Sequence, residues 1–152
     1  MVDHKEDTLN SMQARLCREF PRVKLHAAVA DSTDTDTMTR LLRCRGVTLI
    51  LHAAAHKNLP LMERQPIEAV ANNVLGTSRL LSVAQDLRVP RFVLISSDKA
   101  VYPSSIMGAT KRLGELLVCS LNAGTTICAA VRFGNVLGSS GSVLPLFQKQ
   151  IQ

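Results

Sequence analysis

The 152 residues fit one domain, and a composition of 46% apolar and 20% charged residues excludes a disordered chain. The net charge of +6 comes from scattered Lys and Arg, and aromatic residues make up only 3%, so nucleic-acid binding is not expected. No apolar run approaches the roughly 20 residues that span a bilayer, and the charged N-terminus is not a secretory signal.

The four cysteines give no sign of a metal or redox site. None of them falls in a C-x-x-C pair, and we predict no metal site of any kind. We expect reduced, partly buried thiols and a cytoplasmic protein. The cysteines are Cys17, Cys44, Cys119 and Cys128.

Short apolar strands alternate with longer helical segments along the chain. This alternation predicts an α/β fold, a parallel sheet with helices on both faces, whose ligands bind at the carboxyl ends of the strands. The predicted elements, in chain order, are a helix at 7–20, a strand at 23–30, a helix at 35–45, a strand at 47–52, a helix at 66–87, a strand at 91–97, a helix at 106–121, a strand at 126–133 and the start of a helix at 142–152.

Hydroxyl and charged side chains follow the third predicted strand. Ser97 ends this strand, and Asp98 and Lys99 come next in the turn. The following helix carries Met107 and Lys111 four residues apart, and therefore on one face. A hydroxyl at a strand end and a lysine on the next helix form the scaffold of the short-chain dehydrogenases, in which a Tyr usually precedes the Lys by four residues.

Three long segments carry a resemblance to one family. They are HAAAHKNLPLMERQPIEAVANNVLGT (52–77), LISSDKAVYPSSIMGATKR (94–112) and VRFGNVLGSSGSVLPLFQKQI (131–151). These segments resemble the nucleotide-sugar 4,6-dehydratases of polysaccharide biosynthesis, in the extended short-chain dehydrogenase/reductase superfamily. The resemblance implies a Rossmann fold, NAD(P) as cofactor, and a UDP-sugar such as UDP-N-acetylglucosamine as substrate, used for capsule or O-antigen precursors.

The resemblance also implies roles for the residues after the third strand. Asp98 would be the acid and Lys99 the base of water elimination across C5 and C6, and Ser97 would bond the C4 oxygen. Lys111 would hold the nicotinamide ribose. Met107 stands at the usual Tyr position and cannot exchange a proton. The base for the C4 hydroxyl is therefore open among Lys111, Ser97 and a water.

Further positions match binding roles in the family. Asn73 matches an asparagine that braces the site. The cofactor positions after strands are Asp3, Asp31, Ala53, Ala54 and Ala55, and the substrate positions are Lys57 and Asn135. The alanines are small enough for a cofactor to pass closely. Asn58 stands where the family usually has His.

The sequence departs from the family in its length. It contains no G-x-x-G-x-x-G loop, which would hold the pyrophosphate. We therefore expect residues 1–152 to form a single truncated Rossmann-like domain, without the first strand and without the C-terminal substrate lobe. Without a first strand, strand 23–30 is expected to pair directly with strand 47–52, leaving an exposed edge.

Three functions remain open at this point. The first is a dehydratase, which the adjacent Asp98 and Lys99 favour. The second is a nucleotide-sugar epimerase of the same fold, which Met107 disfavours. The third is an inactive or partner-binding remnant, which the missing loop favours. Full-length relatives are expected to form homo-oligomers and to be anchored at a membrane in some cases, while this chain contains no membrane segment.

Overall fold

The computed structural model describes residues 1–120, 125–136, 147 and 150–151, and it has two parallel sheets. The first sheet pairs β1 (Val2–Asp3) with β2 (Ala28–Val29). The second sheet has the order β3-β4-β5, with β3 at Leu49–His52, β4 at Arg91–Ile95 and β5 at Ile127–Val131. The predicted α/β class with parallel strands is confirmed.

The predicted pairing of strand 23–30 with strand 47–52 is wrong. β2 pairs with β1, because the first residues of the chain form a short strand beside it: the Ala28 amide donates to the Met1 carbonyl at 3.0 Å, and the Ala30 amide donates to the Asp3 carbonyl at 3.1 Å. β3 hydrogen-bonds to β4 alone in the described part of the chain. Its other edge, where strand 23–30 was expected, has no partner strand among the described residues.

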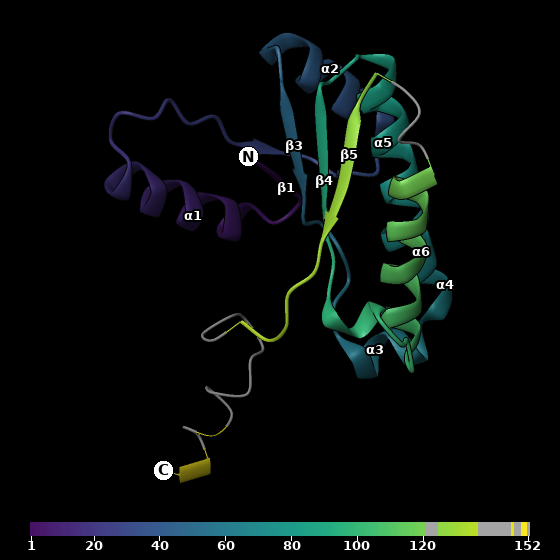
Figure 1. The fold of residues 1–152 in the computed structure, drawn as a ribbon. Coiled ribbons are helices and arrows are strands. Elements are labelled where there is room, and N and C mark those ends of the chain that lie inside the picture. The colour runs from purple at the N-terminus through teal and green to yellow at the C-terminus, as the bar shows by residue number, and fades with distance from the viewer. Residues whose placement is uncertain (121–124, 137–146, 148–149, 152) are drawn as a thin grey trace.

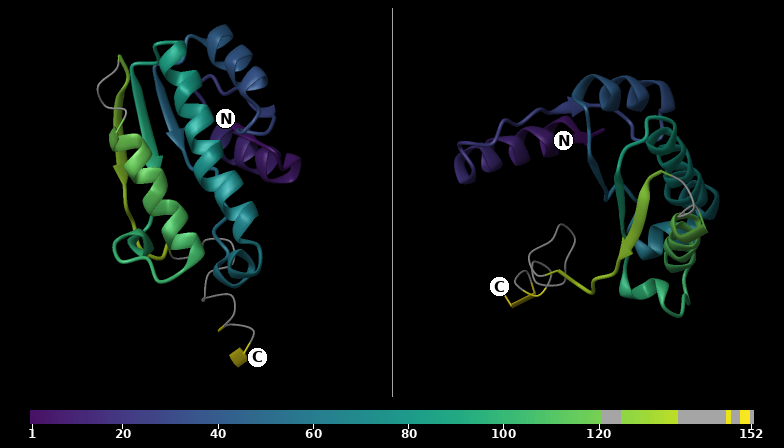
Figure 2. Two further views of the ribbon diagram at one scale, coloured as in Figure 1. Left: turned by 90° about the vertical axis from the view of Figure 1, so that its right-hand side faces the viewer. Right: turned by 45° about the horizontal axis from the view of Figure 1, so that its top comes forward.

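The helices lie around these sheets as Figure 1 shows. Helix α1 (Glu6–Glu19) packs against β1 and β2, on the opposite side from the other helices. Helices α5 (Thr77–Asp86) and α6 (Ile106–Ser120) run along one face of the β3-β4-β5 sheet, and α2 (Thr35–Arg45) packs on α5. Figure 2 shows this helical layer from its outer side.

The helix predicted at 66–87 is interrupted. It begins as α4 (Pro66–Val70), continues as a π-helix at Ala71–Gly76, and only then becomes α5. A short helix, α3 (Leu59–Arg64), precedes it, and a 3₁₀ turn occupies Asp98–Ala100. The helix predicted from residue 142 lies mostly outside the described residues.

Helix α2 has the predicted bounds because both of its ends are capped. The Asp34 carboxylate accepts hydrogen bonds from the Asp36 and Thr37 amides at 3.1 Å. Gly46 ends the helix at φ 55°, a left-handed conformation that a residue with a Cβ adopts at a cost. Local chemistry therefore sets where this helix begins and ends.

The core lies between the β3-β4-β5 sheet and its helices. Phe92, Leu81 and Val118 are completely buried there. No helix among the described residues packs on the other face of the same sheet, where Leu51 is 64% exposed and Ile127 is 70% exposed. The alternation of buried and exposed residues along β3 follows from this one-sided cover, whereas strands of parallel sheets usually bury both faces.

The cysteines are more exposed than predicted. Cys17, Cys44 and Cys119 are exposed, and Cys128 alone is buried, under the helical layer. The reason is that the first three lie on the outer sides of helices, while Cys128 lies on the covered face of β5. No helix in the described ranges has the length and apolar character needed to cross a membrane.

Candidate functional site

The turn after β4 brings a hydroxyl, a carboxylate and an ammonium group together. Ser97 caps the 3₁₀ turn, and its Oγ donates to Asp98 Oδ1 at 2.9 Å. Lys99 Nζ lies 3.0 Å from Asp98 Oδ1 and 3.3 Å from Asn135 Oδ1. Four predicted site residues therefore form one hydrogen-bonded cluster at the carboxyl ends of β4 and β5, where α/β folds bind ligands. This cluster, called the Lys99 group below, consists of Ser97, Asp98, Lys99 and Asn135.

The Lys99 hydrogen bond, and then that of Ser97, lower the pKa of Asp98 below its usual value. Asp98 is consequently ionised at neutral pH in the free chain. It gains the ability to donate a proton only when a proton is transferred within the pair, or when a bound molecule separates it from Lys99. The side chains of both residues are accessible to such a molecule, with Asp98 54% exposed.

A glycine permits the close approach of α6 to this turn. A Cβ on Gly108 would lie 2.5 Å from the Lys99 carbonyl oxygen, which is closer than real Cβ atoms come. Any other residue at this position would push the Lys99 backbone away from the helix. Gly108 therefore sets the distance between the turn and the first residues of α6.

Lys111 reaches from α6 to the end of β4. Its Nζ donates to the Ile95 carbonyl oxygen at 2.9 Å. Burial lowers the pKa of Lys111 to about 8, against the opposing effect of the Glu115 charge. A fraction of this lysine is therefore neutral near physiological pH, which suits a group that exchanges protons.

Met107 is a core residue in this structure. It is 4% exposed and packs with Met62 and Ala69 in a small cluster under α3 and α4. The position at which the resembled family has its Tyr therefore faces packed apolar side chains and supplies no polar group.

Asn73 ties three segments together from the π-helix. Its Oδ1 accepts from the His56 amide at 2.8 Å, and its Nδ2 donates to the His56 carbonyl and to Thr110 Oγ1, each at 3.0 Å. The side-chain amide is thus fully used, and it fixes the loop after β3 against α6. This geometry fits the bracing role that the resemblance implies.

A buried histidine continues this network. Thr77 Oγ1 donates its only hydrogen to the Asn73 carbonyl at 2.7 Å, so His52 Nε2, 3.0 Å away, must be the donor to Thr77. Burial, with a smaller contribution from the Lys111 charge, lowers the pKa of His52 to about 4. His52 is therefore neutral and carries its proton on Nε2.

The remaining predicted residues lie on other segments of the chain. Asp3 is the last residue of β1 and Asp31 follows β2, and their carboxylates accept local hydrogen bonds from the Lys5 and Thr33 amides. Asn58, the position of the usual His, caps α3 by accepting the Leu61 amide. Ala53, Ala54, Ala55 and Lys57 occupy the loop after β3, where the first two alanines and Lys57 are exposed.

Sequence reasoning missed Glu115. This residue is 3% exposed on α6 and accepts bonds from Ser96 Oγ and the Arg132 guanidinium. A signal was present, since a carboxylate beside Gly114 and Val118 lies on the side of α6 that faces the sheet. Its partner Arg132 follows β5 and could not be named from sequence.

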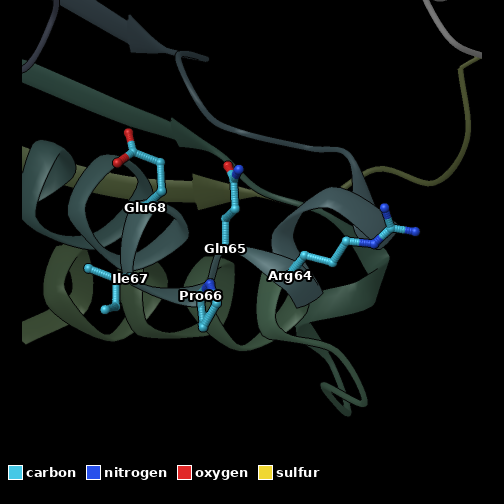
Figure 3. A pocket seen from close by; sticks show the side chains of 5 residues that line it. All are labelled: Arg64, Gln65, Pro66, Ile67 and Glu68. Carbon is cyan, nitrogen blue, oxygen red and sulfur yellow. The ribbon is translucent and has the colours of Figure 1, made fainter.

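The surface pocket shown in Figure 3 contains none of the predicted site residues. It lies at the junction of α3 and α4 and is lined by Arg64, Gln65, Pro66, Ile67 and Glu68. Among the described residues, no three His, Cys, Asp or Glu side chains gather as metal ligands would. The candidate site is therefore defined by the chemistry of the Lys99 group.

Comparison with known proteins gives a consistent set of relatives. The family model described as polysaccharide biosynthesis protein matches residues 1–152. The probable polysaccharide biosynthesis protein EpsC of Bacillus subtilis is 45% identical over 154 residues, covering 100% of this chain and 26% of the relative. A UDP-glucose 4-epimerase of Rickettsia akari is 45% identical over 144 residues, covering 91% of this chain and 40% of the relative.

Solved structures share the fold. Pen from Bacillus thuringiensis superposes with a TM-score of 0.89 at 30% identity, covering 99% of this chain and 46% of that one. The dTDP-glucose 4,6-dehydratase DesIV from Streptomyces venezuelae, solved with NAD and TYD bound, has a TM-score of 0.76 at 23% identity, covering 91% of this chain and 48% of that one. The present chain thus spans half or less of the length of each of these proteins.

Proposed function

The chain belongs to the polysaccharide biosynthesis protein family, and on this premise we propose that it carries the catalytic groups of a nucleotide-sugar 4,6-dehydratase of the UDP-N-acetylglucosamine type. The observation that supports this proposal most directly is the contact of Asp98 with Lys99 and Asn135 at the carboxyl ends of β4 and β5. An acid and a base held side by side suit the removal of water from adjacent carbons.

The proposed chemistry assigns one proton to each member of the pair. Once C4 carries a ketone, the neighbouring C5–H is acidic. A proton first passes from the Lys99 ammonium to the Asp98 carboxylate, and the neutral Lys99 amine then removes the C5 proton. Asp98 delivers its proton to the departing 6-hydroxyl, so that one water leaves and a C5–C6 double bond forms, and Lys99 later returns a proton, exchanged with solvent, to C5. Ser97 would hold the C4 oxygen in place.

The residues fit a nicotinamide cofactor in part. Lys111 lies where it could hold a ribose, and the alanines after β3 leave room for close passage. The 152 residues contain no glycine-rich pyrophosphate loop. NAD, when bound, supplies the chemistry of hydride removal from C4 and hydride return at C6.

Lys111 is the favoured base for the C4 hydroxyl among Lys111, Ser97 and water. Its lowered pKa of about 8 leaves part of it unprotonated near neutral pH. Ser97 already donates its hydrogen to Asp98, and the buried Met107 offers no proton acceptor. This assignment makes Lys111 both the ribose-binding and the proton-accepting group.

A 4-epimerase is the second candidate, because the Rickettsia relative carries that name. Epimerisation inverts C4 and requires no base at C5, so it would give the Asp98–Lys99 pair no catalytic role. The two reactions differ in product mass and in exchange with solvent, which makes them separable in one experiment.

The experiment incubates the chain with NAD and UDP-N-acetylglucosamine in deuterated water and follows the sugar by mass spectrometry and NMR. A dehydratase gives a product that has lost one water and carries deuterium at C5. An epimerase gives a product of unchanged mass without deuterium at carbon. Calorimetry with NAD runs in parallel, and an absence of both binding and product would favour an inactive or partner-binding role.

Matched lysine variants assign the base. We expect Lys99→Ala to abolish product formation and C5 deuteration while NAD binding stays unchanged, because Lys99 acts on the sugar. Lys24→Ala, which removes an exposed lysine before β2, is the control and should behave as the wild type. Full deuteration by Lys99→Ala would contradict the assignment.

A further inference from the structure

Glu115 is a charged side chain in an almost completely buried place. Such a carboxylate is costly to bury unless it is paired and hydrogen-bonded on all sides. Its Oε1 accepts from Ser96 Oγ at 2.6 Å and from Arg132 Nε at 2.8 Å. Its Oε2 accepts from Arg132 Nη2 at 2.7 Å and from Arg112 Nη1 at 3.0 Å. Both oxygens therefore have two donors each.

These donors come from three different elements. Ser96 directly follows β4, Arg132 directly follows β5, and Arg112 belongs to α6 itself. The two strand ends are also joined beyond the sheet, since the Ser96 amide donates to the Val131 carbonyl at 2.7 Å and the Asp98 amide donates to the Phe133 carbonyl at 3.0 Å. One carboxylate thus links the helix to both strand ends.

The linked segments carry the groups of the candidate site. Ser96 immediately precedes Ser97, and Arg132 lies three residues before Asn135. Lys111 lies one turn before Glu115 on the same helix, so the two side chains are neighbours. A movement of Glu115 would therefore be transmitted to the turn and to Lys111 together.

We propose that Glu115 is a positioning residue, which fixes the Ser97–Lys99 turn and Lys111 relative to each other by binding Ser96 and Arg132 at once. The positioning follows from the geometry of the chain alone, and its consequence for catalysis rests on the proposed function. A bidentate arginine gives this arrangement directional precision that a single hydrogen bond lacks.

Glu115 influences Lys111 through its negative charge as well as through its hydrogen bonds. The Arg132 hydrogen bonds, helped by Ser96 and Arg112, lower the pKa of Glu115 to about 2, so the carboxylate is ionised at all ordinary pH values. This charge raises the pKa of Lys111 against the effect of burial. His52, which faces Lys111 from β3, is neutral above about pH 4 and does not replace it.

The test titrates Lys111 in the whole chain by NMR of lysine side chains labelled with ¹³C at Cε. The variants are Glu115→Gln, which keeps the shape and removes the charge, and Glu19→Gln, which makes the same change at an exposed pair with Arg15 in α1. We expect Glu115→Gln to shift the Lys111 midpoint to lower pH and to move the amide resonances of Ser97 and Lys99, while Glu19→Gln changes neither.

A folded Glu115→Gln variant whose Lys111 midpoint and turn amides equal those of the wild type would overturn the proposal, because a merely stabilising residue moves neither. Should Glu115→Gln not fold, Ser96→Ala tests the same link with the charge pair intact. It is expected to move the turn amides and leave the Lys111 midpoint in place, and unmoved amides would overturn the proposal. These titrations need neither nucleotide nor turnover, so they stand or fall independently of the dehydratase activity.

Discussion

The β1–α1–β2 region and the β3–β5 region both alternate strands with helices, but they differ in how many of their apolar side chains are buried. Strands β1 and β2 have two residues each, and Leu9 is the buried residue of α1. Strands β4 and β5 have five residues each, and they share a continuous core with α5 and α6.

The difference lies in the cover that each apolar face receives. In the helix predicted at 7–20, apolar residues recur at spacings of three and four, at Leu9, Met12, Leu16 and Phe20. Met12 is nevertheless 45% exposed and Phe20 is 51% exposed. Phe92 on β4 belongs to the core cluster between the sheet and its helices and is completely buried. Periodicity predicts that a helix or strand forms, whereas a facing layer decides how much it contributes to stability.

The largest difference in stability is expected between alanine substitutions at two phenylalanines, one in each region. Phe92→Ala should lower the free energy of unfolding by about 3–5 kcal/mol, because it leaves a cavity in the core. Phe20→Ala removes the same atoms from an exposed position and should change it by less than about 0.5 kcal/mol. Urea denaturation of both variants measures the difference. Equal losses would mean that the end of α1 is packed as tightly as β4.

A smaller difference is expected between two histidines in how strongly each makes the free energy of unfolding depend on pH. The pKa of His52 is about 4 in the folded chain and 6.5 in the unfolded chain. The unfolded chain therefore binds a proton on this imidazole more readily than the folded chain does. Stability is therefore lost as the pH falls from 6.5 to 4, by about 3 kcal/mol in total at roughly 1.4 kcal/mol per pKa unit.

The measurement follows unfolding between pH 4.5 and 7, above the ordinary pKa of Glu115. His52→Gln should flatten the pH dependence in this window. His26 lies before β2 and is exposed, with its pKa lowered chiefly by the Arg45 charge. His26→Gln should leave the slope nearly as it is in the wild type, and an equal flattening by both variants would contradict the assignment to His52.

The smallest effect on the whole chain is expected from Leu9→Ala. This substitution empties the one buried position of α1, so amide hydrogen exchange in α1 should accelerate at least about tenfold. Exchange in β4 should not change, because its protection comes from the other region. Acceleration in β4 as well would show that the two regions unfold as one unit.

Local chemistry made part of this fold predictable. Helix α2 was predicted with its observed bounds, and Gly46 marks its end in the sequence. Asp98 and Lys99 are adjacent in the sequence, so they were predicted together, and the 3₁₀ turn brings their charged groups into contact. The pairing of β1 with β2 was missed because two residues give no periodic signal, and its partner lies 26 residues away.

The rest depended on contacts between distant segments. Glu115 and Arg132 meet only when α6 packs on the sheet, and no sequence spacing announces such a pair. The same holds for the burial of Met107 among Met62 and Ala69, which the Tyr position of the resembled family did not suggest. The site residues that share the turn after β4 were predictable from the sequence, whereas the Glu115–Arg132 pair, which forms between a helix and a strand end, was not.

The π-helix at Ala71–Gly76 has a consequence for how this segment tolerates changes of length. A π-turn holds one residue more than an α-turn, so its removal rotates every later position by about 100° relative to the earlier ones. Asn73 faces His56 and Thr110 before the end of the π-turn, while Leu80 and Leu81 face the core after it. After deletion of one residue, either the Asn73 contacts or the packing of Leu80 and Leu81 could be kept, but not both. Most substitutions on the outer side of the segment would keep both. The number of residues in this segment is thus more constrained than their identity.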